Sequence, residues 1–252
     1  MINPLCLEGK RILVTGASSG IGQSCARILS RLGARLLITA RNEMRLIETL
    51  NSLDGTGHLY ECLDLCDPDT ISPWLKKMAT EGGLFDGVVH CAGVELTKPL
   101  KMTKISDYSY VMNVNVATAF SLAQGFRQKG VFHAPASIVL LSSVAGNVGQ
   151  PAHSAYCASK AAVQGLSRSL ALELSRDGIR VNCISPGLVK TQMTAAMEKK
   201  ITPSQFQDII NAHPLGLGSP DDIAYAAAFL LAETGRWITG SNLIVDGGFT
   251  AH

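Results

Sequence analysis

The chain has 252 residues, of which 46% are hydrophobic and 17% are charged, a balance typical of a globular protein and unlike that of a disordered one. Its 22 basic and 20 acidic residues give a formal net charge of +2, and no basic run is long enough to indicate nucleic acid or a membrane surface as a partner. The N-terminus lacks the pattern of a secretion signal and no apolar run reaches the ~18 residues of a membrane span, so we expect a cytoplasmic protein.

The seven cysteines are scattered, and no two of them have the spacing of a CxxC motif. Cys62 and Cys66 form the only close pair, and no cluster of histidines lies beside them in the sequence. This pattern predicts reduced thiols, with neither a disulfide framework nor a metal site.

Apolar runs of strand length alternate with segments of helical periodicity along the whole chain. The expected strands are residues 11–15, 35–40, 58–63, 85–92, 137–143, 179–185 and 242–246. The expected helices between them are residues 20–32, 42–52, 68–80, 104–128, 153–176 and 220–232. This alternation predicts an α/β fold, in which residues 1–252 form a single domain with a Rossmann-type doubly wound parallel sheet and helices on both faces.

Residues 188–218 interrupt this alternation, because they form a longer segment than an ordinary connection between a helix and a strand. Met193, Met197, Phe206 and Ile209 lie there among Lys, Gln and Pro residues. The segment is either a lid over a substrate site or a helical excursion on the surface, and the sequence supports both interpretations equally.

The first expected strand runs directly into the sequence TGASSGIG, residues 15–22, which leads into the first expected helix. A glycine-rich turn at this place lets backbone N–H groups and the helix N-terminus bind a pyrophosphate. Gly16 permits the tight turn, Gly20 lets the backbone approach a dinucleotide, and Gly22 allows close packing of the helix on the sheet. The expected cofactor contacts of this turn also include Ser18, Ser19 and Ile21.

Arg41 follows the second expected strand, where dinucleotide-binding proteins commonly carry an acidic residue that holds the adenosine ribose. Here Ala40 occupies the position of that acid, and the Arg41 guanidinium could pair with a 2′-phosphate. The pattern favours NADP(H) over NAD(H). Alternatively, Arg41 only caps the following helix, and because the glycine turn adds no second cation, use of both cofactors also remains open.

Tyr156 and Lys160 lie four residues apart in the sequence SAYCASKAA, residues 154–162, and therefore on the same side of a helix. An ammonium one turn away favours the phenolate over the phenol. Lowering a phenol pKa from ~10 to ~7 takes about 4 kcal/mol, which one ammonium and a nearby nicotinamide cation could supply. The pair therefore indicates acid–base chemistry.

The glycine turn, the Tyr–Lys pair and a preceding serine together resemble the short-chain dehydrogenase/reductase family over nearly the whole chain, and the pattern is closest to its 3-oxoacyl-acyl-carrier-protein reductase-like branch. The resemblance implies that Ser143, thirteen residues before Tyr156, hydrogen-bonds the substrate oxygen. It also implies a catalytic asparagine in the sequence NVNVATAF, where the spacing favours Asn115 over Asn113. In the family this residue holds a water in a proton relay behind the lysine.

The resemblance implies further cofactor contacts, which the family places after the third, fourth and sixth strands. They are Asp64 and Leu65, then Ala92 and Gly93, and finally Pro186, Gly187, Val189 and Thr191 near the nicotinamide. Asp64 could instead cap a helix, although Asp67 before Pro68 suits that role better. One departure from the family is the pair His90–Cys91, which stands where an Asn–Asn pair is usual. We expect His90 to be structural.

These features predict an oxidoreductase that reduces a ketone to a secondary alcohol with NADP(H), by hydride transfer at a site formed by Asn115, Ser143, Tyr156 and Lys160. The ketone is either a 3-oxoacyl thioester or a small carbonyl compound. The alternatives are an NAD(H)-dependent dehydrogenase of a sugar, polyol or steroid alcohol, and a cofactor-binding sensor or scaffold without turnover.

The resemblance also implies a homotetramer and raises the question of an acyl-carrier partner. Family members that act on carrier-bound substrates present basic residues near the ends of two helices, and this chain has Ala134 and Asp177 there. Arg127, Lys129 and Arg176 lie close enough in the sequence to substitute for them.

Overall fold

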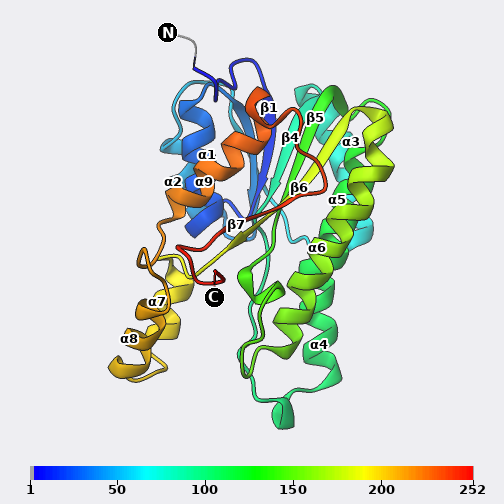
Figure 1. Cartoon of the computed structure of the whole chain (residues 1–252). Helices are drawn as coiled ribbons and strands as arrows, with labels where there is room; N and C mark the ends of the chain where they lie inside the picture. Colours follow the sequence, from blue (N-terminus) through cyan, green and yellow to red (C-terminus); the bar gives the residue numbers. More distant parts are fainter. Residues whose placement is uncertain (1–2, 252) are drawn as a thin grey trace.

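A computed structural model describes residues 3–251 and contains one sheet of seven strands, in which all neighbouring strands run parallel (Figure 1). The strand order is β3-β2-β1-β4-β5-β6-β7, so it reverses between β1 and β4. The strands are β1 (Arg11–Thr15), β2 (Arg35–Ala40), β3 (Leu59–Cys62), β4 (Phe85–His90), β5 (Phe132–Leu141), β6 (Ile179–Pro186) and β7 (Asn242–Val245). The predicted Rossmann-type sheet is therefore confirmed.

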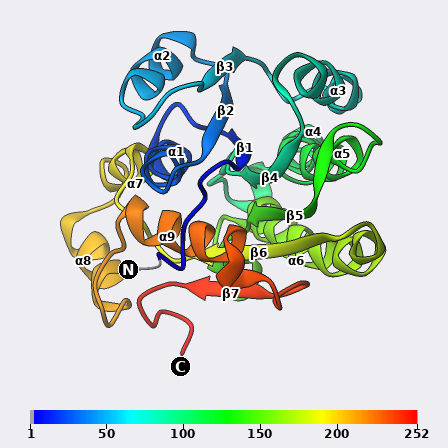
Figure 2. The same cartoon turned by 90° about the horizontal axis from the view of Figure 1, so that it is seen from above.

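Helices cover both faces of this sheet (Figure 2). One face carries α1 (Gly20–Arg31), α2 (Glu43–Asn51) and α9 (Pro220–Leu231). The opposite face carries α3 (Ile71–Gly82), α5 (Thr118–Phe126) and α6 (Ser154–Leu174). None of the helices described within residues 3–251 has the length and apolar character needed to cross a lipid bilayer.

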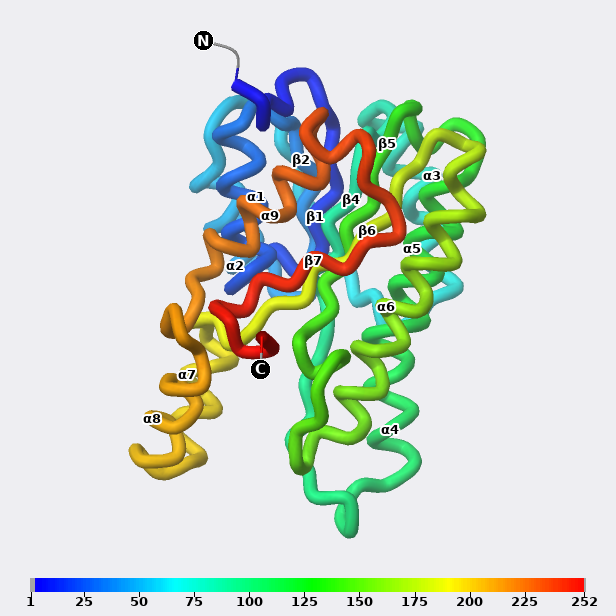
Figure 3. The backbone as a smooth tube through the Cα atoms, in the orientation of Figure 1, coloured from blue at the N-terminus to red at the C-terminus, as the bar shows by residue number. Residues whose placement is uncertain are grey.

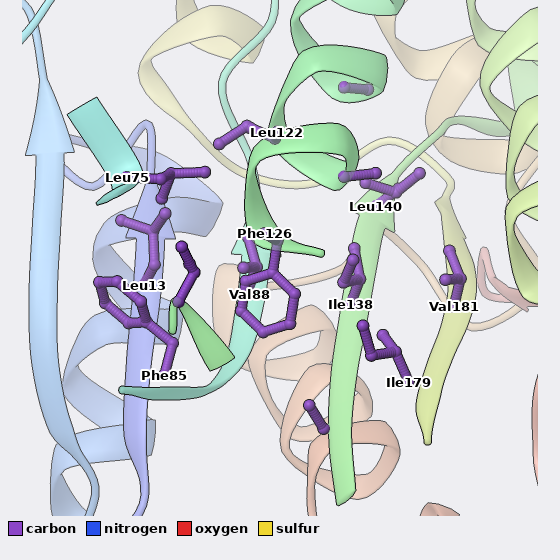
Figure 4. Packing of buried hydrophobic residues seen from close by; sticks show 14 of the residues in the cluster. Leu13, Leu75, Phe85, Val88, Leu122, Phe126, Ile138, Leu140, Ile179 and Val181 are labelled. Atoms are coloured by element: carbon purple, nitrogen blue, oxygen red, sulfur yellow. The ribbon is translucent and has the colours of Figure 1, made fainter. Parts of the chain in front are cut away.

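The two faces of the sheet have separate hydrophobic cores, because successive side chains of a strand point to opposite sides. Figure 4 shows part of the core beneath α3 and α5, where Phe126 packs among Val88, Ile138 and Leu75. The core on the other face includes Leu46 of α2, which is completely buried. With both faces covered, the central strands consist almost entirely of buried residues, as expected of a parallel sheet.

The helix predicted for residues 104–128 is helical over residues 105–126, but it contains a π-helical turn at Asn113–Ala117 between α4 (Ile105–Met112) and α5 that the sequence did not predict. The Thr118 hydroxyl donates to the Asn113 carbonyl across this turn, at 3.2 Å. Apolar periodicity does not reveal such a turn, because the residues on both sides of it remain helical. Single π-turns inside α-helices are frequent at functional sites.

Residues 188–218 contain two short helices, α7 (Gln192–Glu198) and α8 (Pro203–Asn211), which extend beyond the edge where the strands end (Figure 3). At the base of this segment Val189 pairs with Gly218, and the Leu188 N–H donates to His213 Nε2 at 3.1 Å. The His213 ring stacks on Phe249, with ring centroids 4.7 Å apart. The base is thus fixed to the body of the protein.

We expect Leu46→Ala to lower the free energy of unfolding by about 2 to 5 kcal/mol, because it leaves a cavity in the core between α2 and the sheet. Met44, on the same helix, is 75% exposed, and Met44→Ala should change stability by less than ~0.5 kcal/mol. Urea denaturation of both variants measures the difference. An equal loss of unfolding free energy in the two variants would contradict the assignment of Leu46 to the core.

Candidate active site

A cavity of about 450 Å³ opens at the edge where the strands end. Its walls come from the connections after β4, β5 and β6, from the N-terminal part of α6, and from α7 and α8. Nine of the predicted site residues line it, namely Ile21, Gly93, Ser143, Tyr156, Lys160, Pro186, Gly187, Val189 and Thr191. Segments far apart in the sequence therefore meet at one place.

The Tyr156 phenol is enclosed at the start of α6, close to the hydroxyl of Ser143. Burial raises the pKa of Tyr156 to about 12, and the Ser143 hydroxyl opposes this rise. The phenol therefore carries its proton at neutral pH and can donate it.

Lys160 lies one turn along α6 and is only 6% exposed. Its Nζ donates to the Leu141 carbonyl at 2.9 Å and lies 5.7 Å from the centroid of the Tyr156 ring. Burial lowers the pKa of Lys160 to about 8. In the chain without a cofactor, desolvation of the phenolate raises the Tyr156 pKa, and the expected lowering by Lys160 together with a nicotinamide cation stays a prediction.

Asn115 lies in the π-helical turn and is 2% exposed. Its Oδ1 accepts from the Val94 N–H at 2.8 Å, and its Nδ2 donates to the Val94 carbonyl and to Ser159 Oγ, both at 2.9 Å. The Asn115 side chain thus joins the loop after β4 to the turn of α6 that carries Tyr156 and Lys160. Asn113, the other candidate, lies elsewhere and donates to the Cys66 carbonyl at 2.7 Å.

Glycines in the turn before α1 let neighbouring backbone segments pack closely together. Gly16 has a φ of +66°, and a Cβ there would lie 2.8 Å from the Ala92 nitrogen. A Cβ on Gly22 would clash with the Gly16 carbonyl, so only glycine fits there. Ser19 precedes α1 without a side-chain capping bond, and the first turn contains no acidic residue. The N–H groups of this helix end are available to an anion.

Arg41 is exposed after β2, and its guanidinium makes no hydrogen bond or ion pair with any residue in the described range 3–251. Asn42, and not Arg41, caps α2, since its side chain accepts from the Arg45 N–H at 3.0 Å. A hydrogen bond with the Cys66 side chain is the main cause that lowers the Asp64 pKa, and the Cys66 N–H, which donates to Asp64 Oδ1 at 3.0 Å, and the charge of Arg41 lower it further. The carboxylate that would face an adenine is therefore ionised.

His90 is 3% exposed at the end of β4, and its Nδ1 lies 2.8 Å from Thr15 Oγ1. The same Thr15 oxygen accepts from the Ala92 N–H at 3.2 Å. Burial lowers the His90 pKa to about 3, so the ring is neutral. His90 therefore joins β1 to the turn after β4, in agreement with the structural role expected from the sequence.

Two residues near Tyr156 that were not predicted from the sequence are His153, whose ring centroid lies 6.4 Å from that of Tyr156, and its partner Glu95. Glu95 lines the cavity, and its Oε1 lies 2.9 Å from His153 Nε2, although the two residues are 58 positions apart. Met193, Met197 and Asp208 of α7 and α8 also line the cavity. Only the position of His153, three residues before Tyr156, could have drawn attention to it.

We expect Lys160→Met to raise the free energy of unfolding at pH 7. The folded-state pKa of about 8 lies below the ordinary 10.5, so burying the ammonium costs the unsubstituted protein about 3 kcal/mol of stability below pH 8. The variant avoids this cost, but it also loses the Lys160 hydrogen bond, which reduces its gain by ~1 kcal/mol. Between these pKa values the folded state binds fewer protons than the unfolded state, so the stability of the unsubstituted protein rises with pH. The difference in unfolding free energy between Lys160→Met and the unsubstituted protein should therefore become smaller as the pH rises above 8.

Urea denaturation from pH 7 to pH 9.5 measures this change, with the exposed Lys101→Met as the matched control. A variant that is less stable by the same amount at every pH would contradict the burial of a charged Lys160.

Comparison with known families gives a match over residues 16–250 to the family described as "Enoyl-(Acyl carrier protein) reductase". The chain is similar to the 3-oxoacyl-acyl-carrier-protein reductase FabG of Rickettsia prowazekii, with 35% identity over 243 residues, 96% of this chain and 97% of the relative. The FabG of Escherichia coli K12 is 34% identical over 244 residues, which cover 96% of this chain and 97% of the relative.

Solved structures with the same fold include a dehydrogenase/reductase from Sinorhizobium meliloti 1021, with a TM-score of 0.89 and 29% identity over 98% of this chain and 97% of that one. A short-chain type dehydrogenase/reductase from Mycobacterium ulcerans has a TM-score of 0.88 and 29% identity, covering 98% of this chain and 92% of that one. The chain therefore belongs to the short-chain dehydrogenase/reductase family and is an NAD(P)-dependent oxidoreductase.

Proposed function

We propose that the protein reduces a ketone to a secondary alcohol with NADPH. The observation that carries this proposal is the convergence of Ser143, Tyr156 and Lys160 in a cavity beside the glycine turn, with the Tyr156 phenol held protonated. A protonated phenol suits reduction, because the carbonyl oxygen needs a proton as the hydride arrives. The names of the relatives, which are 3-oxoacyl-acyl-carrier-protein reductases, support the same direction.

The residues around the glycine turn fit a dinucleotide. The uncapped N-terminus of α1 would hold the pyrophosphate, and the exposed Arg41 guanidinium would hold a 2′-phosphate. Asp64, Ala92 and Gly93 would contact the adenosine, and Pro186, Gly187 and Thr191 the nicotinamide. When bound, NADPH supplies the hydride that adds to the carbonyl carbon.

The protein side chains complete the reduction at the substrate oxygen. Tyr156 Oη gives its proton to that oxygen, and the Ser143 hydroxyl donates a hydrogen bond to it. The phenolate that remains is stabilised by the nearby Lys160 ammonium until a proton returns. Asn115 keeps the Val94 backbone and α6 in place around these groups.

Residues 188–218 act as the substrate lid in this proposal. Met193, Thr194 and Met197 of α7, together with Asp208 and Ile209 of α8, line the cavity wall opposite α6. The fixed base of the segment, formed by the pairing of Val189 and Gly218, lets the two helices move as a unit over the cavity.

A free carbonyl compound fits the surface better than a substrate carried on an acidic protein. Arg127, one of the cations that could attract such a carrier, is held by Asp177 in an ion pair of 2.7 Å. That pairing reduces the positive charge offered to a partner.

We also expect a homotetramer, because Ile105 and Leu172 on the helices that pair in relatives are 81% and 77% exposed.

Tyr156→Phe should abolish the proton transfer and lower turnover of ketones by about 10² to 10⁴-fold, while NADPH still binds. Steady-state NADPH oxidation with a panel of ketones and diketones, together with fluorescence titration of NADPH, separates the two effects. The matched control is Tyr225→Phe, which removes the hydroxyl of a tyrosine that is 52% exposed on α9. If no ketone is turned over by the unsubstituted protein although NADPH binds, the sensor interpretation replaces the proposal.

Arg41→Ala should weaken NADPH binding by about 10 to 100-fold and leave NADH binding nearly unchanged, because only NADPH carries the 2′-phosphate. Fluorescence titration of each cofactor measures this difference. Arg31→Ala is the matched control, since that arginine is exposed and paired with Asp54. Equal or tighter binding of NADH to the unsubstituted protein would instead favour oxidation of a sugar, polyol or steroid alcohol.

A further inference from the structure

A carboxylate stands in the wall of the cavity and takes no part in the proposed proton transfer. Glu95 lies in the connection between β4 and α4, and its side chain is 22% exposed. Glu95 and Tyr156 line the same cavity, and His153, which contacts Glu95 at 2.9 Å, has its ring centroid 6.4 Å from that of Tyr156. A substrate whose carbonyl oxygen reaches Tyr156 therefore brings its neighbouring atoms toward Glu95.

His153 fixes the orientation of this carboxylate. Its side chain is 7% exposed, and its Nδ1 lies 2.9 Å from the Pro151 carbonyl, so Nδ1 must carry a proton. Nε2 lies 2.9 Å from Glu95 Oε1, and a lone pair on Nε2 would repel a carboxylate. The Thr97 hydroxyl oxygen also lies 2.9 Å from Nε2. An imidazolium can share its Nε2–H between ionised Glu95 and this hydroxyl oxygen, in agreement with the raised His153 pKa, for which the hydrogen bond to Glu95 is the main cause.

Only one oxygen of Glu95 is used by the protein. Oε1 receives both His153 and the Thr97 hydroxyl, the latter at 3.3 Å. Within residues 3–251, Oε2 has no hydrogen-bond partner, and it is not a buried atom. Because Glu95 lines the cavity, Oε2 is accessible to a ligand there. Lys200, between α7 and α8, attracts the carboxylate but does not come within 4.0 Å of it in the described part of the chain.

The polar and charged residues of the cavity wall indicate which kind of substrate group would bind to Oε2. Glu95 and Asp208 line the cavity, whereas the ammonium of Lys160 is turned toward the Leu141 carbonyl. No arginine is present among the lining residues in the described range. Because His153 balances the charge of Glu95, the wall offers a hydrogen-bond acceptor at this place rather than a net charge, and it favours a neutral hydrogen-bond donor.

We propose that Glu95, positioned by His153, is a specificity-determining residue that accepts a hydrogen bond from a hydroxyl or amino group close to the ketone. The inference rests on the proposed ketone reduction and adds the substrate class to it. A site that accepts a hydrogen bond from its substrate discriminates strongly against an analogue without the donor group. When such an analogue binds, the carboxylate loses its hydrogen bonds to water and gains none from the ligand.

The test compares kcat/KM for 1-hydroxy-2-butanone and 4-hydroxy-2-butanone with that for 2-butanone at saturating NADPH. The better hydroxyketone should exceed 2-butanone by about 10 to 100-fold. Glu95→Ala should bring that ratio close to one, and the exposed Glu48→Ala of α2 should keep it. Because both ketones use the same Tyr156, any change of its pKa in the Glu95 variant cancels in the ratio.

Further measurements separate the positioning of Glu95 by His153 from an effect of the substitutions on folding. His153→Ala should lower the ratio by raising KM for the hydroxyketone more than it lowers kcat, and His153→Gln, which keeps a donor, should restore part of it. NADPH titration shows whether each variant keeps its folded cofactor site. Levulinate, an anionic ketone, should be reduced more slowly than 2-butanone and should gain rate in Glu95→Ala.

A ratio near one in the unsubstituted protein, or a ratio that Glu95→Ala leaves unchanged, overturns the role of Glu95 while ketone reduction stands. If no ketone is reduced although NADPH binds, ketone reduction itself fails, and the inference fails with it.

Discussion

The two-sided hydrogen bonding of Asn115 is the contact on which the geometry of the site depends. One side chain satisfies both backbone groups of Val94 and, at the same time, the Ser159 hydroxyl of α6. A buried amide that makes all these bonds has no alternative arrangement of similar free energy. The loop after β4 and the helix that carries Tyr156 and Lys160 are therefore held at a fixed separation.

The π-helical turn at Asn113–Ala117 is best understood together with this contact. Within this turn Asn115 contacts Ser159 of α6, whereas Asn113 contacts the Cys66 carbonyl in the loop after β3. Gly93 belongs to the same arrangement, since a Cβ there would lie 3.1 Å from Asn115 Oδ1 and 3.5 Å from Lys160 Nζ. The irregular helix, the glycine and the asparagine thus form one structural unit.

Burial controls the protonation of the two central groups in opposite senses. It raises the pKa of Tyr156 to about 12 and lowers that of Lys160 to about 8, because in both cases the charged form loses solvent. The phenol is a donor in this state, and the lysine can lose its charge under mildly alkaline conditions. A neighbouring carboxylate, Glu95, adds to the preference for the protonated phenol. Both effects keep the proton on the Tyr156 phenol in the chain without a cofactor.

The sequence by itself determined the features that depend on local rules. Alternating strands and helices predict the parallel sheet, the turn at residues 15–22 requires glycine because of its close backbone contacts, and the spacing of Tyr156 and Lys160 places them on one side of α6. Only the tertiary structure decided the sign of the Tyr156 pKa shift, since that shift depends on how deeply the phenol is buried. The contact between Glu95 and His153 was decided there too, because the fold brings together residues that no periodicity relates, 58 positions apart.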